Sequence, residues 1–144
     1  MAKAAVFKWE DLPKQDFDGG LVRRAGFRQD HGLLVFTWLD PKLKRLAPMR
    51  ASFDKIILNY DGEQYVEIDG KAYKLTPRSM IRIPAGAAHT NWPAGNAGAF
   101  AIEVHTPESE LLYLANWQKE FPASAQQPPK PRAEQPFTGE TVKD

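Results

Sequence analysis

Cysteine is absent from this 144-residue sequence, and histidine occurs only three times. Without cysteine the chain can form no disulfide bond, offers no thiol nucleophile and has no sulfur ligand for zinc. It also lacks any run of about 18 apolar residues, which a membrane-spanning helix needs, and residues 1–15 lack the apolar core of a signal peptide. We therefore expect a cytoplasmic protein that has no membrane partner.

An excess of charge of one sign is missing as well. The chain has 19 Lys and Arg against 18 Asp and Glu, for a formal net charge of +1, and the basic residues are scattered among the acids. Proteins that bind nucleic acids gather their basic residues into a patch, so we expect no nucleic-acid partner. The length is sufficient for one domain with a sizeable core.

The sequence does contain a series of short β-prone segments separated by turn residues. Branched and aromatic residues fill the segments, and Gly, Pro and Asp lie between them, a pattern typical of closely spaced strands. Asp61-Gly62 and Asp69-Gly70 each connect two such segments, where an Asp-Gly pair favours a hairpin. The pattern predicts an all-β antiparallel barrel or sandwich, with strands at residues 4–9, 33–39, 55–60, 64–68, 72–75, 80–83 and 99–105, and a further β segment that begins at His89.

The last part of the chain has a different composition. Residues 108–119 carry apolar side chains near helical spacing, which predicts a short C-terminal helix. Residues 121–144 are rich in Pro, Gln and Ala and predict a tail or arm, either disordered or lying across a partner subunit. We expect a single domain over residues 1–120, followed by this Pro-rich tail.

Residues 80–92 (MIRIPAGAAHTNW) combine a β-prone run with a tight turn. Pro84 has no N–H for a strand ladder and therefore fits a strand end, and Gly86 readily adopts the backbone conformation of a turn. We expect the chain to double back here, which would place His89 at a defined position beside the turn. A lone histidine is more often structural than functional, so other residues must decide the role of His89.

Four segments follow one another along the chain: Asp61-Gly62-Glu63, Ile68-Asp69-Gly70, Ile83-Pro84-Ala85-Gly86 with His89, and Val104-His105-Thr106-Pro107. In this order they resemble the core pattern of a small single-domain cupin of the RmlC-like type. The resemblance covers about residues 30–117, and it implies a double-stranded β-helix, or jelly-roll barrel, that forms homodimers. The family's second motif usually has Gly at the place of Arg78.

The resemblance fails at the residues that bind metal in cupins. The family's first motif supplies two His as HxH and then a Glu or Gln, and these places fall near Met49, Ala51 and Lys55. Residues 48–55 (PMRASFDK) contain no His, and only His89 remains of the usual metal set. The resemblance therefore implies a cupin with a degenerate first metal motif, for which we expect no cofactor.

In the first hypothesis for the interior, the site works without metal. Lys55 lies where the family has a metal ligand, and its ammonium could stabilise an anionic substrate or an oxyanion; with a lowered pKa it could act as a base or Schiff-base nucleophile. Strand alternation puts Glu103 and His105 on one face, and the resemblance to cupins that linearise unsaturated uronates implies an inward catalytic acid at Glu103. His89, with a pKa near neutrality, would transfer protons. The alternative for Lys55 is a surface position.

Two further hypotheses remain open. In the second, His31, His89 and His105, with Glu103 or Asp30, hold Fe, Mn, Ni or Zn, as in a metal-dependent dioxygenase or lyase. In the third, the barrel binds a small ligand without chemistry. We prefer the first, an isomerase, lyase or cyclase that acts on a small acidic or carbonyl compound.

Several other polar side chains are weaker candidates. Arg50, Tyr60 and Arg82 are candidate substrate-binding residues, since an inward arginine can bind a carboxylate bidentately. Outward exposure is the alternative for both arginines. We expect Arg23 and Arg24 to lie on a solvated face.

Overall fold

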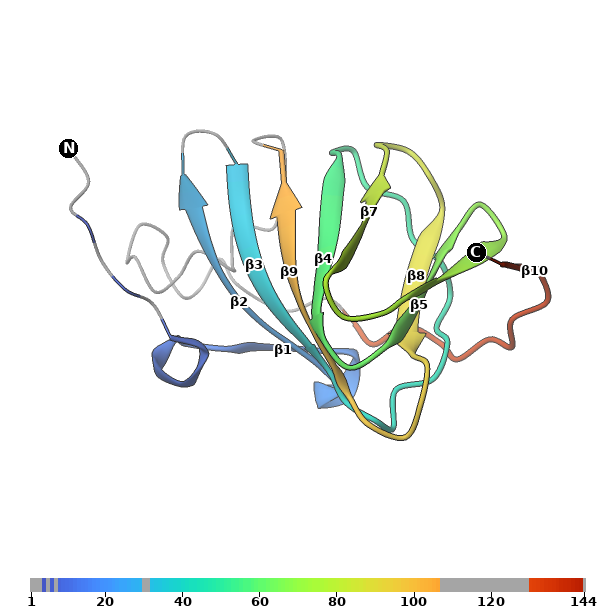
Figure 1. The fold of residues 1–144 in the computed structure, drawn as a ribbon, viewed down its shortest axis with the longest axis horizontal. Coiled ribbons are helices and arrows are strands. Elements are labelled where there is room, and N and C mark those ends of the chain that lie inside the picture. The colour runs from blue at the N-terminus through green and yellow to red at the C-terminus, as the bar shows by residue number, and fades with distance from the viewer. Residues whose placement is uncertain (1–3, 5, 7, 30–31, 107–129, 144) are drawn as a thin grey trace.

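The computed structural model describes residues 4, 6, 8–29, 32–106 and 130–143, which form two packed β-sheets (Figure 1). The only helices among these residues are two three-residue 3-10 turns, η1 (Trp9–Asp11) and η2 (Asp18–Gly20), and none is long and apolar enough to cross a membrane. The expected all-β jelly-roll fold is confirmed. Its strands are β1 (Gln15–Phe17), β2 (Val22–Gln29), β3 (Gly32–Leu39), β4 (Lys55–Asp61), β5 (Gln64–Ile68), β6 (Lys71–Leu75), β7 (Ser79–Ile83), β8 (His89–Pro93), β9 (Ala99–His105) and β10 (Glu140–Val142).

The larger sheet has the strand order β1-β2-β3-β9-β4-β7, and all of its neighbouring strands are antiparallel. Strand β9 lies between β3 and β4, so its register places Val35 and Ile57 on either side of Glu103. Buried residues alternate with more exposed ones along β4 and β9, as the pleat of a strand requires. This sheet therefore brings side chains from three remote segments to one inner face.

The smaller sheet has the order β10-β6-β5-β8. Strand β5 pairs with β6 and β8 in antiparallel fashion, whereas β10 pairs with β6 in parallel. The segment that leads to β10 also runs along the loop after β3, because Gln135 N donates to Arg45 O at 3.0 Å and Ala47 N donates to Ala133 O at 2.8 Å. Residues 130–143 of the expected tail thus form an arm on the chain's own second sheet.

The two Asp-Gly turns behave differently. Asp69 and Gly70 have φ values of 49° and 84° and connect β5 to β6 in the expected hairpin. Asp61-Gly62 instead links β4 of the larger sheet to β5 of the smaller one, so the expectation of a hairpin there is wrong. The turn at Gly86 likewise leads from β7 to β8 in the other sheet, and the chain crosses between sheets there rather than doubling back.

The N-terminal part departs from expectation. None of the described residues among 4–9 lies in a strand, so the strand expected there is wrong. Trp9 begins η1, and its ring packs edge-on against Phe36 and Phe100, with centroids 6.5 and 5.2 Å apart. This aromatic packing outweighs the β-propensity of the preceding residues. The helix expected at 108–119 and residues 121–129 lie outside the described residues.

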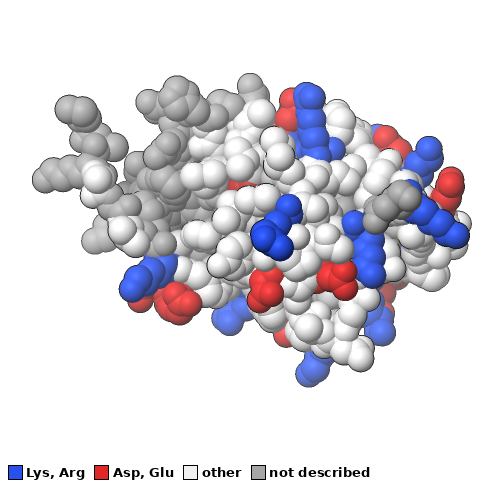
Figure 2. Space-filling model, in the orientation of Figure 1, with Lys and Arg blue, Asp and Glu red and all other residues white. Residues whose placement is uncertain are grey.

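Apolar side chains fill the space between the sheets in two clusters. The first consists of Phe17, Val22, Leu33, Val35, Leu39, Leu43, Leu46 and Ala99. The second consists of Ile57, Val66, Leu75, Ile83 and Ala101, which come from both sheets. On the face of the molecule in Figure 2, Lys and Arg side chains are interspersed with Asp and Glu. The described surface in this view shows no concentration of one charge, so a functional site is expected among the buried polar residues on the inner face of the larger sheet.

Candidate functional site

The centre of the larger sheet carries a buried polar cluster. Lys55 on β4 lies directly opposite His105 on β9, and Glu103 is two residues before His105 on the same face. Thr37 reaches the same face from β3. All four side chains are buried, with exposures of 8% for Lys55 and 1% or less for the others. Of the two placements open for Lys55, the surface position is thus contradicted, and the inward placement of Glu103 and His105 agrees with strand alternation.

Glu103 is the acceptor at the centre of this cluster. Thr37 Oγ1 donates to Glu103 Oε2 at 2.9 Å, and His105 Nε2 lies 2.9 Å from Glu103 Oε1. Burial alone raises the pKa of Glu103, but the charges of Lys55 and Arg24 and the His105 hydrogen bond bring that pKa well below its usual value. Glu103 is therefore an ionised carboxylate that holds its neighbours.

Lys55 lies between this carboxylate and the interior cavity. Its Nζ is 3.8 Å from Glu103 Oε1. Burial lowers the pKa of Lys55, as do the charges of Arg24 and Arg132, although Glu103 opposes the shift. A buried lysine with a lowered pKa can hold an anion, and it gives up its proton more readily than an exposed lysine.

His89 enters the site from the first position of β8, in the smaller sheet. Its Nδ1–H donates to the carbonyl oxygen of Ala87 at 3.0 Å, and because a carbonyl only accepts, the neutral ring carries its lone pair on Nε2. Nε2 is buried and has no hydrogen-bond partner among the described residues. Burial and the charge of Lys55 lower the pKa of His89 to about 4. His89 therefore presents a free base.

His105 lies deeper than His89. Its ring stacks on Phe53 with centroids 4.8 Å apart and an interplanar angle of 28°. Burial lowers the pKa of His105, although Glu103 opposes the shift. His105 is fully buried, is hydrogen-bonded to Glu103 and does not line the cavity, so its role is to hold the Glu103 carboxylate in position.

A cavity of about 620 Å³ opens beside this cluster, within the size range of small-molecule sites. Lys55 and His89 both line it, whereas Glu103 and His105 do not. The loop between β3 and β4 forms one wall and is fixed to β8 by two backbone hydrogen bonds between Met49 and His89. The described lining residues are Phe17, Asp18, Arg24, Ala47, Pro48, Met49, Arg50, Ala51, Ser52, Phe53, Lys55, His89, Lys130 and Arg132.

Several lining residues, among them Asp18, Arg24 and Arg132, were not singled out from the sequence. The expectation that Arg24 lies on a solvated face is wrong, because its side chain is only 14% exposed and its NH2 is 3.8 Å from Glu103 Oε2. Arg23 does point outward, with a side chain that is 49% exposed and paired with Asp16. Strand alternation was the available signal, since β2 pairs Arg24 with the inward Thr37.

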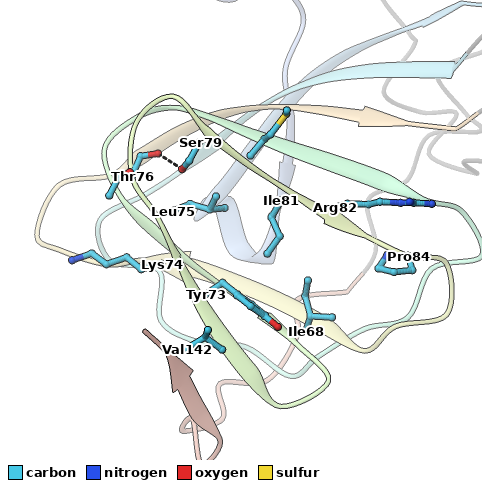
Figure 3. A pocket seen from close by; sticks show the side chains of 11 residues that line it. Ile68, Tyr73, Lys74, Leu75, Thr76, Ser79, Ile81, Arg82, Pro84 and Val142 are labelled. Carbon is cyan, nitrogen blue, oxygen red and sulfur yellow. Dashed lines mark hydrogen bonds between the residues drawn. The ribbon is translucent and has the colours of Figure 1, made fainter. Parts of the chain in front are cut away.

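The three candidate substrate-binding residues are not brought together. Arg50 lines the cavity, and its NH1 donates to Gly86 O at 2.6 Å. Tyr60 is 65% exposed, and its ring contacts Phe100 away from the cavity. Arg82 is exposed and lines a second pocket of about 590 Å³ between β6 and β7 (Figure 3).

The part of the cavity lining that the structure describes does not fit the divalent metal that the cupin fold implies. The described residues contain no group of three or more His, Asp or Glu that could hold a metal ion, and His31 and Asp30 of the second hypothesis lie outside them. The described lining offers one imidazole, His89, and one carboxylate, Asp18, which already binds Arg132 at 3.1 Å. Arg24 and Lys55 beside them would repel a dication.

Comparison with known proteins places these features in a family. Residues 42–139 match the family model of the AraC-like ligand binding domain, while no curated protein matches the chain. An RmlC-like cupin from Shewanella frigidimarina NCIMB 400 is 21% identical, with a TM-score of 0.61 over 75% of this chain and 95% of that one. KdgF from a Halomonas species is 18% identical, with a TM-score of 0.63 over 75% and 97%.

A third structure, a predicted oxalate decarboxylase from Thermotoga maritima, is 15% identical, with a TM-score of 0.59 over 71% of this chain and 98% of that one. At these identities the three structures establish the fold alone. The family model covers most of the chain, including the loop after β3, the strands β4 to β9 and part of the C-terminal arm. The chain is a small cupin that belongs to the AraC-like ligand binding domain family.

Proposed function

We propose that this cupin catalyses proton transfer, of the isomerase or lyase type, on a small acidic or carbonyl compound without the usual cupin metal set. One observation carries the proposal: His89 Nε2 is buried, has no partner among the described residues and lines the same cavity as Lys55. A free base next to a buried ammonium is the pair of groups that such a reaction needs.

The two groups have complementary roles. His89 Nε2 takes a proton from the carbon next to a carbonyl group, the C–H electron pair forms a C=C bond, and the carbonyl π electrons move to oxygen. The ammonium of Lys55 stabilises the resulting oxyanion. The imidazolium of His89 then returns the proton to the same carbon. In the isomerisation of a hydroxy ketone, the hydroxyl proton passes to the oxyanion, and the imidazolium returns its proton to the former carbonyl carbon.

The low pKa of His89 is compatible with this role once a ligand is bound. Burial and the charge of Lys55 cause the shift in the free protein. An anionic substrate next to Lys55 offsets that charge, so the pKa of His89 rises toward neutrality, where a general base works best. Glu103 lies behind Lys55, and its charge opposes the loss of the ammonium proton.

Non-catalytic ligand binding is the second candidate. The family description, a ligand binding domain, supports small-molecule binding in general. Glu103 and His105 are hydrogen-bonded to each other and do not line the cavity, so only two of the four candidate catalytic residues, His89 and Lys55, have access to a ligand there. Binding without turnover would favour this candidate.

Deuterium exchange tests the first candidate. A panel of small keto acids and hydroxy ketones is incubated with the protein in D₂O, and loss of the C–H signal next to the carbonyl is followed by NMR. We expect exchange with the unaltered protein and a loss of about 100-fold or more in His89→Gln. Lys74→Gln, a change at an exposed lysine, should exchange at the unaltered rate. Exchange that persists in His89→Gln would contradict the assignment.

Metal analysis tests the absence of a resident metal. Protein purified without a histidine tag should contain well under one equivalent of Fe, Mn, Ni or Zn, and chelation should leave exchange unchanged. Near-stoichiometric metal in that preparation would instead support the metal-dependent hypothesis. The homodimer and the cytoplasmic location expected from the sequence stay predictions, and light scattering during size-exclusion chromatography would test the former.

A further inference from the structure

Arg24 lies at the cavity, where one of its donors has no acceptor among the described residues. Its guanidinium carbon lies 4.7 Å from the centroid of the Phe17 ring, and its NH2 is 3.8 Å from Glu103 Oε2, too far for a hydrogen bond. Its Nε is buried and has no hydrogen-bond partner among the described residues. Arginine always carries its charge and its N–H groups, so this site presents a fixed, unused donor.

Arg132, a second and partly buried arginine at the cavity, already has hydrogen-bond partners. Its Nε and NH2 lie 3.3 and 3.1 Å from the two oxygens of Asp18. Its NH1 also reaches Ala47 O and Thr90 Oγ1 at 3.3 and 3.4 Å. The charges of Arg132 and Asp18 cancel. This pair therefore attaches the C-terminal arm to the cavity wall and leaves no unpaired charge for a ligand.

Among the residues that the structure describes, the remaining buried charges do not balance. Arg24 and Lys55 share one carboxylate, Glu103, at 3.8 Å each. That carboxylate already accepts from Thr37 and lies 2.9 Å from His105 Nε2. A buried cation without a full partner is costly, and one negative charge from a ligand would offset the excess. A ligand carboxylate would supply both this negative charge and an acceptor for the Arg24 Nε–H group.

His89 specifies the other half of the ligand. With Nδ1–H bonded to the Ala87 carbonyl, Nε2 can only accept a hydrogen bond. We propose that the ligand is a hydroxy acid whose carboxylate binds between Arg24 and Lys55 and whose hydroxyl donates to His89 Nε2. This assignment rests on the same site as the proposed function, and it adds the ligand class and makes Arg24 the residue that selects the carboxylate.

Titration with matched acids and amides tests the ligand class. Lactate, malate and gluconate, each against its amide, are titrated calorimetrically into the protein at pH 7 and constant ionic strength. The acids should bind saturably and more tightly than the amides. Arg24→Gln should lose about tenfold to a hundredfold in affinity for an acid, the value of a charge-assisted hydrogen bond, with little change for the amide.

The neighbouring arginine is the matched control. Arg23→Gln removes the same charge one residue away, on the outward face, where it pairs with Asp16. It should bind the acids with unaltered affinity. Should Arg24→Gln fail to fold, Arg24→Lys keeps the charge without the planar fork and should still prefer the acids. In the unaltered protein, the Arg24 Nε–H resonance should shift on addition of acid but not of amide.

Each outcome bears on the assignment. Equal affinity for acids and amides, equal losses in Arg23→Gln and Arg24→Gln, or no saturable binding of any acid would overturn it. Acid binding that depends on Arg24, without deuterium exchange on any compound, would support this inference while the proposed proton transfer fails. Exchange that is indifferent to Arg24 would support the proposed function and overturn this inference.

Discussion

Glu103 stabilises two buried cations at once, so its charge is the most sensitive single feature of the site. Lys55 and Arg24 each lie 3.8 Å from its oxygens, with side-chain exposures of 8% and 14%. Glu103→Gln keeps the shape but leaves both cations without a buried counter-charge. We expect a loss of about 3–5 kcal/mol in the free energy of unfolding, the range for breaking a buried ion pair, measured by urea denaturation at pH 7.

The chain offers a control at the same distance. Lys74 Nζ and Glu63 Oε2 are also 3.8 Å apart, but their side chains are 46% and 45% exposed. Glu63→Gln should cost at most about 1 kcal/mol, because solvent screens an exposed pair. Similar losses in the two variants would mean that burial does not determine the contribution of the Glu103 charge.

Residue by residue, the site was predictable where a family motif or strand parity applied. The motif singled out His89 and the position of Lys55, and parity placed Glu103 with His105. Arg24 was missed because the adjacent Arg23 and Arg24 were both assigned to the solvent-exposed face. In an extended strand, however, neighbouring side chains point to opposite faces. Contact between Arg24 and Glu103 also depends on β3, which lies between their strands.

At the scale of elements, β10 shows how closely the arm approaches the smaller sheet. Glu140 N donates to Gly70 O at 3.1 Å, and a Cβ placed on Gly139 would clash with that oxygen. Because the obstacle is backbone, it cannot rotate away. We expect Gly139→Ala to displace β10 from β6, at a cost on the order of 1–3 kcal/mol, as for other overpacking. Faster hydrogen exchange of the amides of residues 140–142 would report the displacement.

Gly95 provides the comparison, since a Cβ placed there meets nothing within 4 Å. Gly95→Ala should leave exchange at residues 140–142 and the free energy of unfolding nearly unchanged. If Gly139→Ala exchanged as slowly as Gly95→Ala at these amides, the close contact between the arm and the Gly70 turn would be contradicted.

Strand positions were largely predictable, but strand partners were not. Strands β5 and β9 have the bounds expected from alternation and turn residues. Two identical Asp-Gly dipeptides nevertheless gave a hairpin at Asp69-Gly70 and a crossing between sheets at Asp61-Gly62. The difference arises because β4 pairs with β7 and β9, whose residues are distant in sequence. Arg78, at the family's Gly position, adopts a φ of 68°, so the resemblance identified a left-handed position that the residue type conceals.

For the whole molecule, the buried histidines couple folding to pH. Burial lowers the pKa of His89 from 6.5 to about 4 and that of His105 in the same direction. Below pH 6.5 these histidines bind protons in the unfolded chain but stay neutral in the folded protein. The stability present at pH 7 is therefore lost as the pH falls toward 4. For His89 alone the loss approaches roughly 3 kcal/mol. The low pKa of Glu103 adds a further loss below its ordinary value of 4.5.

We therefore expect the free energy of unfolding to fall steadily between pH 7 and pH 4.5. In His89→Gln, which cannot take up the proton, the decline should be shallower, and the remainder should reflect His105. Urea denaturation at half-unit pH steps, compared between the unaltered protein and this variant, measures the difference. Because an anion bound next to Lys55 raises the pKa of His89, a bound acid should also flatten the decline. Parallel curves for the two proteins would mean that His89 has the same pKa in the folded and unfolded states, and the depression of its pKa by burial and Lys55 would be contradicted.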